Sequence, residues 1–122
     1  MVAASLLFYR EGSAVPVLDW LDEQSIEAQN RCLVAFERLA TEGHAARRPL
    51  VENLGRGIYE LRVRVGRVNY RILYFFHGRT AVLLTNGFTK EAEIPRGEIE
   101  LALARKEKFE RNPEMYCVEA EE

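Results

Sequence analysis

The segment from residue 57 to residue 76 constrains the fold of this chain more than any other, because it predicts two long β-strands joined by a tight turn at Gly66-Arg67. In a strand, successive side chains point to opposite faces. The polar residues of the segment fall on alternate positions, and most of them are arginines. One face of the first strand is therefore expected to carry Ile58, Glu60, Arg62 and Arg64, and the other face Tyr59, Leu61, Val63 and Val65.

The turn sets the pairing of these two strands. If Gly66-Arg67 is a two-residue loop, Val65 lies opposite Val68 and Arg62 lies opposite Arg71. Like charges directly across a strand pair are destabilising. A chain that keeps such a pair needs an anion beside it, which comes either from a carboxylate of the same chain or from a ligand.

Length and charge limit the class of protein. With 122 residues, the chain is predicted to form one domain over residues 1–122, with enough residues to bury a core. Its net charge is −2, but residues 44–90 hold nine arginines and lysines and only two glutamates. This central segment therefore carries a charge of +7, and the remainder carries −9. The segregation favours contact with a polyanion through one face, although internal ion pairs would give the same pattern.

The apolar pattern predicts the order strand, helix, helix, three antiparallel strands, helix, which is an α+β fold. Ser13 is expected to cap a short helix, and Ser25 is expected to begin a longer one that ends at Gly43. The apolar stripe of the longer helix is expected to include Ile26, Leu33 and Phe36. The remaining elements are expected as a strand at 6–9, a basic connection at 44–56, strands at 57–65, 68–76 and 81–85, a helix at 95–110 and a mobile acidic tail at 113–122.

The next hairpin decides whether a third cation joins the two arginines. If Gly78-Arg79 closes it, Arg71 lies opposite Asn86, and Lys90 falls on the same face as Arg71. One additional residue in this turn would move the last strand's side chains to the other face. Three converging cations suit a phosphate, which arginine binds through paired hydrogen bonds. Alternatively, Glu60 lies diagonally from Arg71 and neutralises both arginines, which would make the cluster structural.

Other kinds of chemistry find little support in the sequence. Cys32 and Cys117 fit neither a metal site nor a disulfide framework, and His44 and His77 are isolated in expected loops. There is no glycine-rich phosphate loop, no HExxH motif and no recognisable Ser-His-Asp signature. No apolar run reaches the roughly 18 residues of a membrane span. We therefore expect a cytoplasmic protein that uses no metal or other cofactor and contacts no membrane.

Several blocks of the sequence resemble the phage-derived HigB-like branch of the RelE/ParE toxin superfamily. They are residues 54–62 (LGRGIYELR), 70–74 (YRILY), 87–90 (GFTK), Pro95, and 98–102 (EIELA) before Arg105. The likeness covers about residues 5–110 in the order of elements and is most specific in 54–102. It implies a RelE-like fold, in which a small curved antiparallel sheet packs on helices, and the toxin of a type II toxin–antitoxin pair. The implied partner is a small antitoxin, with a helix-turn-helix domain as the expected kind.

The resemblance also implies an activity and the residues that perform it. Relatives of the RelE and HigB kind cut messenger RNA on the ribosome, where the ribose 2′-hydroxyl attacks the adjacent phosphate. Arg62 and Arg71 match the sheet arginines of the family, and Lys90 matches the first lysine of its F-x-K-K block. These three residues are the expected catalytic groups of a metal-independent endoribonuclease. The expected RNA-binding residues are Arg56, Arg64, Arg67 and Arg96.

The sequence departs from the family pattern in two respects. Glu91 stands where the second lysine of that block would be, and the overall charge is acidic for a protein that acts on the ribosome. Two alternatives therefore stay open. One is a ParE-like toxin that inhibits a topoisomerase by binding it, without nuclease chemistry. The other is an inactive remnant that folds and still binds its antitoxin.

Overall fold

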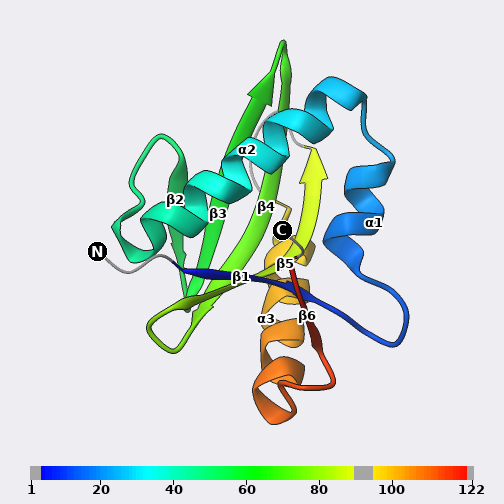
Figure 1. Cartoon of the computed structure of the whole chain (residues 1–122), viewed down its shortest axis with the longest axis vertical. Helices are drawn as coiled ribbons and strands as arrows, with labels where there is room; N and C mark the ends of the chain where they lie inside the picture. Colours follow the sequence, from blue (N-terminus) through cyan, green and yellow to red (C-terminus); the bar gives the residue numbers. More distant parts are fainter. Residues whose placement is uncertain (1–3, 90–94, 121–122) are drawn as a thin grey trace.

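The computed structural model describes residues 4–89 and 95–120, which form a curved six-stranded sheet with helices on both faces (Figure 1). The strands are β1 (Ser5–Tyr9), β2 (Val51–Gly55), β3 (Ile58–Val65), β4 (Val68–His77), β5 (Ala81–Thr89) and β6 (Cys117–Glu119). The helices are α1 (Pro16–Asp22), α2 (Ile26–Glu42), α3 (Arg96–Arg111) and the short 3₁₀ turn η1 (Gly43–Ala45). The predicted α+β class is confirmed.

The sheet differs from the predicted one in two ways. Its order is β2-β3-β4-β5-β1-β6, so β2 and β6 add a strand at each edge. The basic connection at 44–56 contains β2, and the tail at 113–122 contains β6, which pairs with β1. In addition, β1 runs parallel to β5, so the sheet is mixed rather than purely antiparallel. The prediction of an unstructured connection and a mobile tail is therefore wrong where these strands form.

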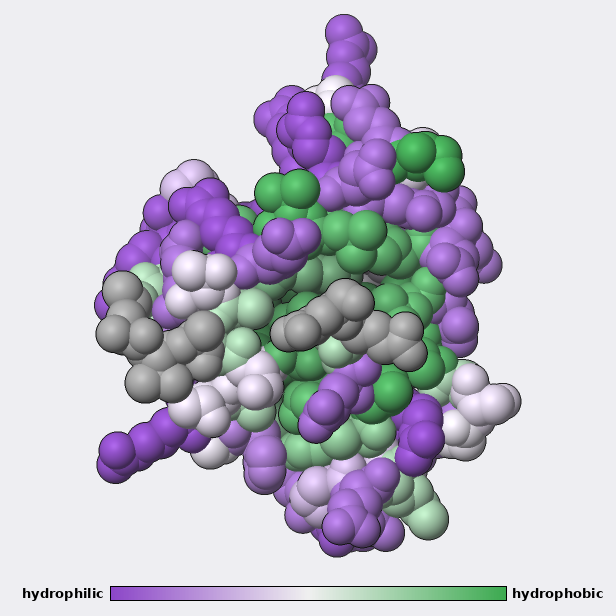
Figure 2. All heavy atoms as spheres, viewed as in Figure 1, coloured by the Kyte–Doolittle hydropathy of each residue, from purple (hydrophilic) through white to green (hydrophobic). Residues whose placement is uncertain are grey.

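Two apolar cores form because the strands alternate their side chains. Leu61, Ile72 and Tyr74 point to the face covered by α1 and α2, whereas Leu73 and Phe75 point to the face covered by α3. Figure 1 shows α2 crossing the front of the sheet and α3 lying behind it. In Figure 2, hydrophobic residues are visible across the face that α2 crosses, and the free end of the β3–β4 hairpin is hydrophilic.

The first two helices begin and end at recognisable signals, with one correction. The Ser25 hydroxyl accepts a hydrogen bond from the Ala28 N–H at 3.1 Å, and Gly43 ends α2 with a φ of 52°. The prediction that Ser13 caps α1 is wrong. The N-cap of α1 is Val15, whose side chain makes no capping bond, and the Val15 N–H donates to the Asp19 carboxylate at 3.2 Å.

The apolar stripe of α2 is also rotated from the predicted one. Ile26 is 71% exposed and Leu33 is 46% exposed, although Phe36 is buried as expected. The positions that face the sheet are Ala28, Cys32, Ala35, Phe36 and Leu39. Three of these are small, which allows the helix to approach the sheet closely. Burial raises the pKa of the Cys32 thiol to about 11, so this cysteine is a neutral packing group at ordinary pH.

The β4–β5 pairing shifts by two residues from the prediction but keeps its faces. His77 pairs with Ala81, so the turn is one residue longer than expected. A bulge follows, because Tyr74 pairs with Leu84 while Leu73 pairs with Asn86. Arg71 therefore lies opposite Phe88 instead of Asn86. The longer turn and the bulge each shift the pairing by one residue. Because the total shift of two residues is even, the side chains of this part of β5 stay on the predicted face.

Helix α3 leaves the outer part of its face uncovered. Asn86 donates from Nδ2 to the Glu98 carboxylate at 3.0 Å, and Arg105 donates to the Thr85 carbonyl at 2.8 Å. The Glu98 contact fixes the first turn of α3 beside the Leu73–Asn86 pair, about 7 Å along the strand from Arg71, and the Arg105 contact fixes the middle of the helix. The helix runs away from the β3–β4 turn (Figure 1). Within the part of the chain that the structure describes, α3 therefore leaves the arginine pair uncovered.

Gly87 is required because Trp20 of α1 approaches β5 closely at this position, and not because the strand bends there. A Cβ at this position would come within 2.6 Å of Cζ3 and 2.8 Å of Cδ2 of the Trp20 indole on α1. We expect Gly87→Ala to lower the free energy of unfolding by about 1–3 kcal/mol, because the indole or the strand must move. Urea unfolding followed by the fluorescence of Trp20, the single tryptophan, measures this. Gly97→Ala is the control, since a Cβ there meets nothing within 4 Å, and equal losses in both variants would contradict the prediction.

Candidate functional site

The β3–β4 hairpin brings the two predicted arginines together. Val65 pairs with Val68 and Arg62 pairs with Arg71, which confirms the predicted register. Both guanidinium groups lie on the α3 side of the sheet, beyond the end of the helix. The Arg62 side chain is 39% exposed and the Arg71 side chain is 17% exposed. A cavity of about 270 Å³ opens there, lined by Pro49, Arg62, Val63, Arg64, Asn69 and Arg71; we call it the arginine cavity.

A single carboxylate holds the two arginines. Glu60 is fully buried, and its Oε1 accepts from Arg62 Nε at 2.7 Å while its Oε2 accepts from Arg71 Nη1 at 3.1 Å. Each attraction acts over a shorter distance than the repulsion between the two guanidinium groups, and so the arrangement is favourable. The anion that we expected beside the arginine pair is therefore a carboxylate of the same chain, that of Glu60. The expectation that Glu60 neutralises both arginines diagonally is confirmed as geometry.

The arginine cavity nevertheless keeps a positive charge. Glu52 on β2 lies 3.7 Å from Arg62 Nη2 and forms a closer pair with Arg48 at 2.6 Å. The hydrogen bond from Arg48 is the main cause that lowers the pKa of Glu52 below its usual range. Together with Arg64 and Arg71, this network contains four arginines and two glutamates. The network therefore has a net charge of +2. The guanidinium N–H groups that do not bind Glu60 can donate to an anionic ligand.

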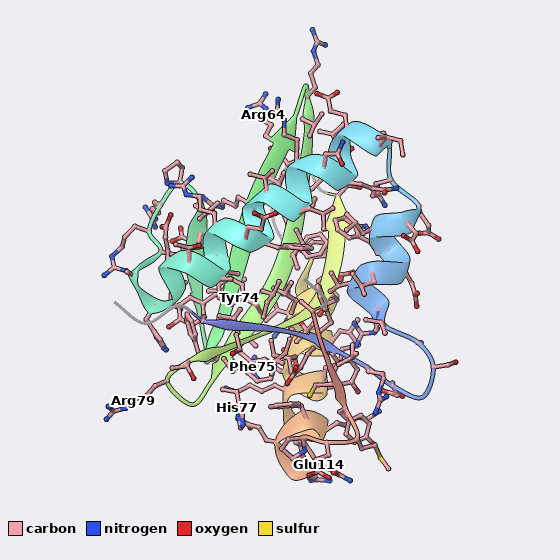
Figure 3. The ribbon with its side chains drawn as sticks, viewed as in Figure 1. Arg64, Tyr74, Phe75, His77, Arg79 and Glu114 are labelled. Atoms are coloured by element: carbon pink, nitrogen blue, oxygen red, sulfur yellow. The ribbon has the colours of Figure 1, made fainter. Side chains whose placement is uncertain are left out.

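The other predicted residues are distributed unevenly. Arg64 lines the arginine cavity near the free end of the hairpin (Figure 3), and Arg67 is exposed in the turn beyond it. Arg56 lies in the turn before β3, at the opposite end of that strand, and pairs with Glu100 of α3 at 3.1 Å. Arg96 is the exposed first residue of α3. Lys90 lies outside the described residues, so its convergence with the arginines stays a prediction.

A second cavity, of about 510 Å³, lies on the other side of the sheet against β2. No pattern in the sequence predicted this cavity. His44 was expected to be an isolated loop residue, but its ring stacks on Phe76 with the centroids 3.7 Å apart. The contact joins η1 to β4 across some thirty residues of sequence. The contact between His44 and Phe76 could be predicted only if it were known that residues 44–56 fold back along β3 as a strand.

Chemically, the arginine cavity is suited to an anion with several oxygens. Guanidinium groups bind phosphate through two parallel N–H donors, and their charge does not titrate near neutral pH. The six described residues around this cavity include no histidine, carboxylate or lysine side chain. Within the described residues, no group of three or more His, Cys, Asp or Glu side chains could hold a metal ion. None of the described helices is long and apolar enough to cross a bilayer.

The fold and the arginine cavity thus define a small α+β protein with a cationic, phosphate-sized depression beside a sheet hairpin. A family model described as phage-derived protein Gp49-like (DUF891) matches residues 19–107, which include every residue that lines the two cavities. The chain belongs to this Gp49-like family, which is a family of RelE-like toxins associated with toxin–antitoxin systems. No curated protein sequence matches the chain.

Proposed function

We propose that this protein is the toxin of a toxin–antitoxin pair and that it cleaves messenger RNA on the ribosome at the arginine cavity. Membership of the Gp49-like family supports the toxin role. The observation that carries the nuclease proposal is the pair Arg62–Arg71, whose guanidinium groups are held beside an open cavity by one buried carboxylate. The HigB-like resemblance supports the choice of RNA.

In this proposal Glu60 positions the two arginines. An arginine side chain that binds phosphate from a disordered state loses rotamer freedom, which costs up to about 2 kcal/mol. Here the hydrogen bonds to Glu60 fix Arg62 and Arg71 before any ligand arrives. Donors that are already aimed at a developing charge stabilise it without reorganisation. The buried carboxylate therefore reduces the net charge of the cavity but improves the geometry of the remaining donors.

The reaction is an internal displacement at phosphorus. The ribose 2′-oxygen forms a bond to phosphorus and loses its proton, and the bond to the 5′-oxygen of the next nucleotide breaks as that oxygen gains a proton. The products are a 2′,3′-cyclic phosphate and a 5′-hydroxyl end. Arg62 and Arg71 would stabilise the additional negative charge on the phosphate oxygens in the transition state.

The described side chains include no strong candidate for the general base of this reaction. Arg48 and Arg62 keep Glu52 ionised by lowering its pKa, which makes it a weak base. Glu60 uses both oxygens on the arginines. The family pattern gives this role to Lys90, and that assignment remains a proposal.

A second candidate function is binding without cleavage. It is favoured by the same Glu60 contacts, because a carboxylate between two arginines is also what a purely structural cluster would show. In this case the protein would still bind its antitoxin through the cationic face or the exposed β2 edge. We expect that antitoxin to be a small protein with a helix-turn-helix domain and an acidic or extended segment.

The test is translation of a defined message in a purified system with and without the protein. We expect cuts within translated codons, with 5′-hydroxyl ends that a polynucleotide kinase labels without prior phosphatase treatment. The same message without ribosomes measures ribosome dependence. Uncut message at protein concentrations that saturate the ribosomes would contradict the nuclease proposal and favour the binding-only candidate. A DNA-supercoiling assay run in parallel would detect a ParE-like activity.

A further inference from the structure

The second cavity has the composition of a site for a planar, anionic ligand. Its volume of about 510 Å³ falls within the roughly 300–1,000 Å³ of small-molecule sites. It lies between η1, the edge strand β2, the start of β3 and the end of β4, on the face opposite to the arginine cavity. The side chains that matter for its chemistry are His44, Arg47, Asn53, Tyr59 and Phe76.

The wall of this cavity is a cluster of aromatic rings. Tyr59 stacks on Tyr74 with the centroids 5.5 Å apart, and Phe76 meets Tyr59 edge-on at 5.1 Å. Tyr74 is fully buried and forms the base of the cluster beneath α2 (Figure 3). Tyr59 and Phe76 are half-buried, and His44, stacked on Phe76, is exposed. Aromatic side chains that line a cavity, as His44, Tyr59 and Phe76 do here, are the kind on which unpaired nucleobases stack.

A cation stands at the mouth of the cavity. Arg47 is exposed, and its Nη1 donates to the carbonyl oxygens of His44 and Ala46, each at 3.0 Å. These acceptors fix the orientation of the guanidinium but carry no formal charge. Among the described residues, no carboxylate lies within ion-pair distance of Arg47, in contrast to Arg48, which Glu52 neutralises. Arg47 therefore keeps its full charge for an anionic ligand.

One polar side chain could read the edge of a base. Asn53 uses its Oδ1 to accept from the Gly55 N–H at 2.9 Å, which leaves its amide N–H groups as donors. Glu52 pairs with Glu60 in the sheet, so its carboxylate lies on the opposite face of β2, where it pairs with Arg48 and Arg62. Aromatic rings beside a positively charged arginine favour a nucleotide over an acidic peptide, because a nucleotide has a base that stacks on the rings.

We propose that this second cavity binds one unpaired nucleotide of RNA, with the base against Tyr59 and Phe76 and its phosphate at Arg47. The identity of the ligand as RNA rests on the proposed function. The two cavities are linked around the β2 edge by the ion pairs of Glu52, which reaches Arg62 at 3.7 Å on one side and Arg48 at 2.6 Å on the other. A single strand that passes around this edge would occupy both cavities.

The experiment is an NMR titration of the full chain, without ribosomes, with each of the four nucleoside 5′-monophosphates. We expect saturable shifts at the amides of Val51, Asn53 and Tyr59. Ribose 5-phosphate and inorganic phosphate are the arms that lack a base. We expect them to bind about 5- to 150-fold more weakly, since stacking of one base on an aromatic ring contributes about 1–3 kcal/mol.

Two variants test the assigned contacts. Arg47→Gln is expected to raise the dissociation constant for the preferred nucleotide about tenfold, because it removes a charge-assisted hydrogen bond. Arg31→Gln is the matched control, since Arg31 is an exposed arginine of α2 about 20 Å from η1 along the helix. It should bind as the unmodified chain does. Retained fold in both variants is checked by the unchanged dispersion of the other amide signals.

Each outcome decides the proposal separately from the proposed function. No saturable shift with any nucleotide, equal shifts with ribose 5-phosphate, or displacement only by an acidic peptide would overturn the nucleotide site. If nucleotides bind as expected but message stays intact in translation, this inference stands and the nuclease proposal fails. If message is cut but no nucleotide binds at Tyr59, the nuclease proposal stands and this inference fails.

Discussion

Glu60→Gln is expected to lower the free energy of unfolding by about 2–4 kcal/mol, one of the two largest effects foreseen for a single site in this protein. Glu60 is fully buried and accepts from both Arg62 and Arg71. Glutamine keeps the volume, but its amide offers one acceptor oxygen and one donor nitrogen. One guanidinium would therefore face another donor, and both would lose their counter-charge. Urea denaturation should show a lower midpoint with an unchanged m value.

The control for this measurement is Glu100→Gln. Glu100 also pairs with an arginine at 3.1 Å, but its side chain and that of Arg56 are 53% and 64% exposed. Exposed pairs of this kind contribute about 0–1 kcal/mol, so this variant should unfold almost as the unmodified chain does. If both variants lose little stability, Glu60 is not the counter-ion that holds the arginines, and the preorganisation argument fails with it.

The register of the β3–β4 hairpin could be predicted because it depends on local information. The Gly66-Arg67 turn fixes which residues pair, and strict alternation fixes the faces. Hence the Arg62–Arg71 pair followed from sequence alone, and the structure confirms it. Sequence reasoning also placed Glu60 next to both arginines but could not choose between a structural counter-ion and a bound anion, since that choice depends on side-chain rotamers and burial.

What sequence reasoning missed depends on contacts between distant segments. The strand β2 was expected to be a connection, because its five residues contain Asn53 and Gly55, which are poor strand formers. It forms because it pairs with β3, and the second cavity forms with it. Likewise β6 is a three-residue strand that exists only through pairing with β1. The bulge in β5 could not be predicted either, because it also depends on pairing between strands.

The arginine variants must separate folding from function, and Arg71→Ala alone does not do so. Among the residues that the structure describes, it leaves the buried Glu60 paired with Arg62 alone, and the removal of one partner from a buried ionic group destabilises the fold. Loss of cleavage in that variant would therefore have two explanations. A variant that removes the carboxylate together with the arginine avoids the difficulty, because no buried charge is left behind.

Glu60→Leu with Arg71→Met is expected to abolish message cleavage while the fold survives. Position 60 pairs with Leu73 on β4 and with Glu52 on β2, so an apolar side chain there has an apolar neighbour on the β4 side. Replacement of a buried ion pair by apolar residues of similar volume is often neutral or stabilising, and we expect unfolding within about 2 kcal/mol of the unmodified chain. Removal of one preorganised donor to a transition-state charge typically costs about 100- to 1,000-fold in rate. Because Arg62 also loses the carboxylate that orients it, we expect at least this loss.

Arg79→Gln is the matched control for the cleavage assay. Arg79 is exposed in the β4–β5 turn, at the far end of the sheet from Arg64 (Figure 3). It should cut at the unmodified rate, as counted by labelled 5′-hydroxyl ends in the translation assay. If the double variant folds and still cuts at that rate, Arg71 takes no part in cleavage and the role of the arginine cavity is structural. A double variant that folds, does not cut and still binds RNA would assign the Arg62–Arg71 pair to the chemical step, because RNA binding would then have survived the loss of the preorganised pair.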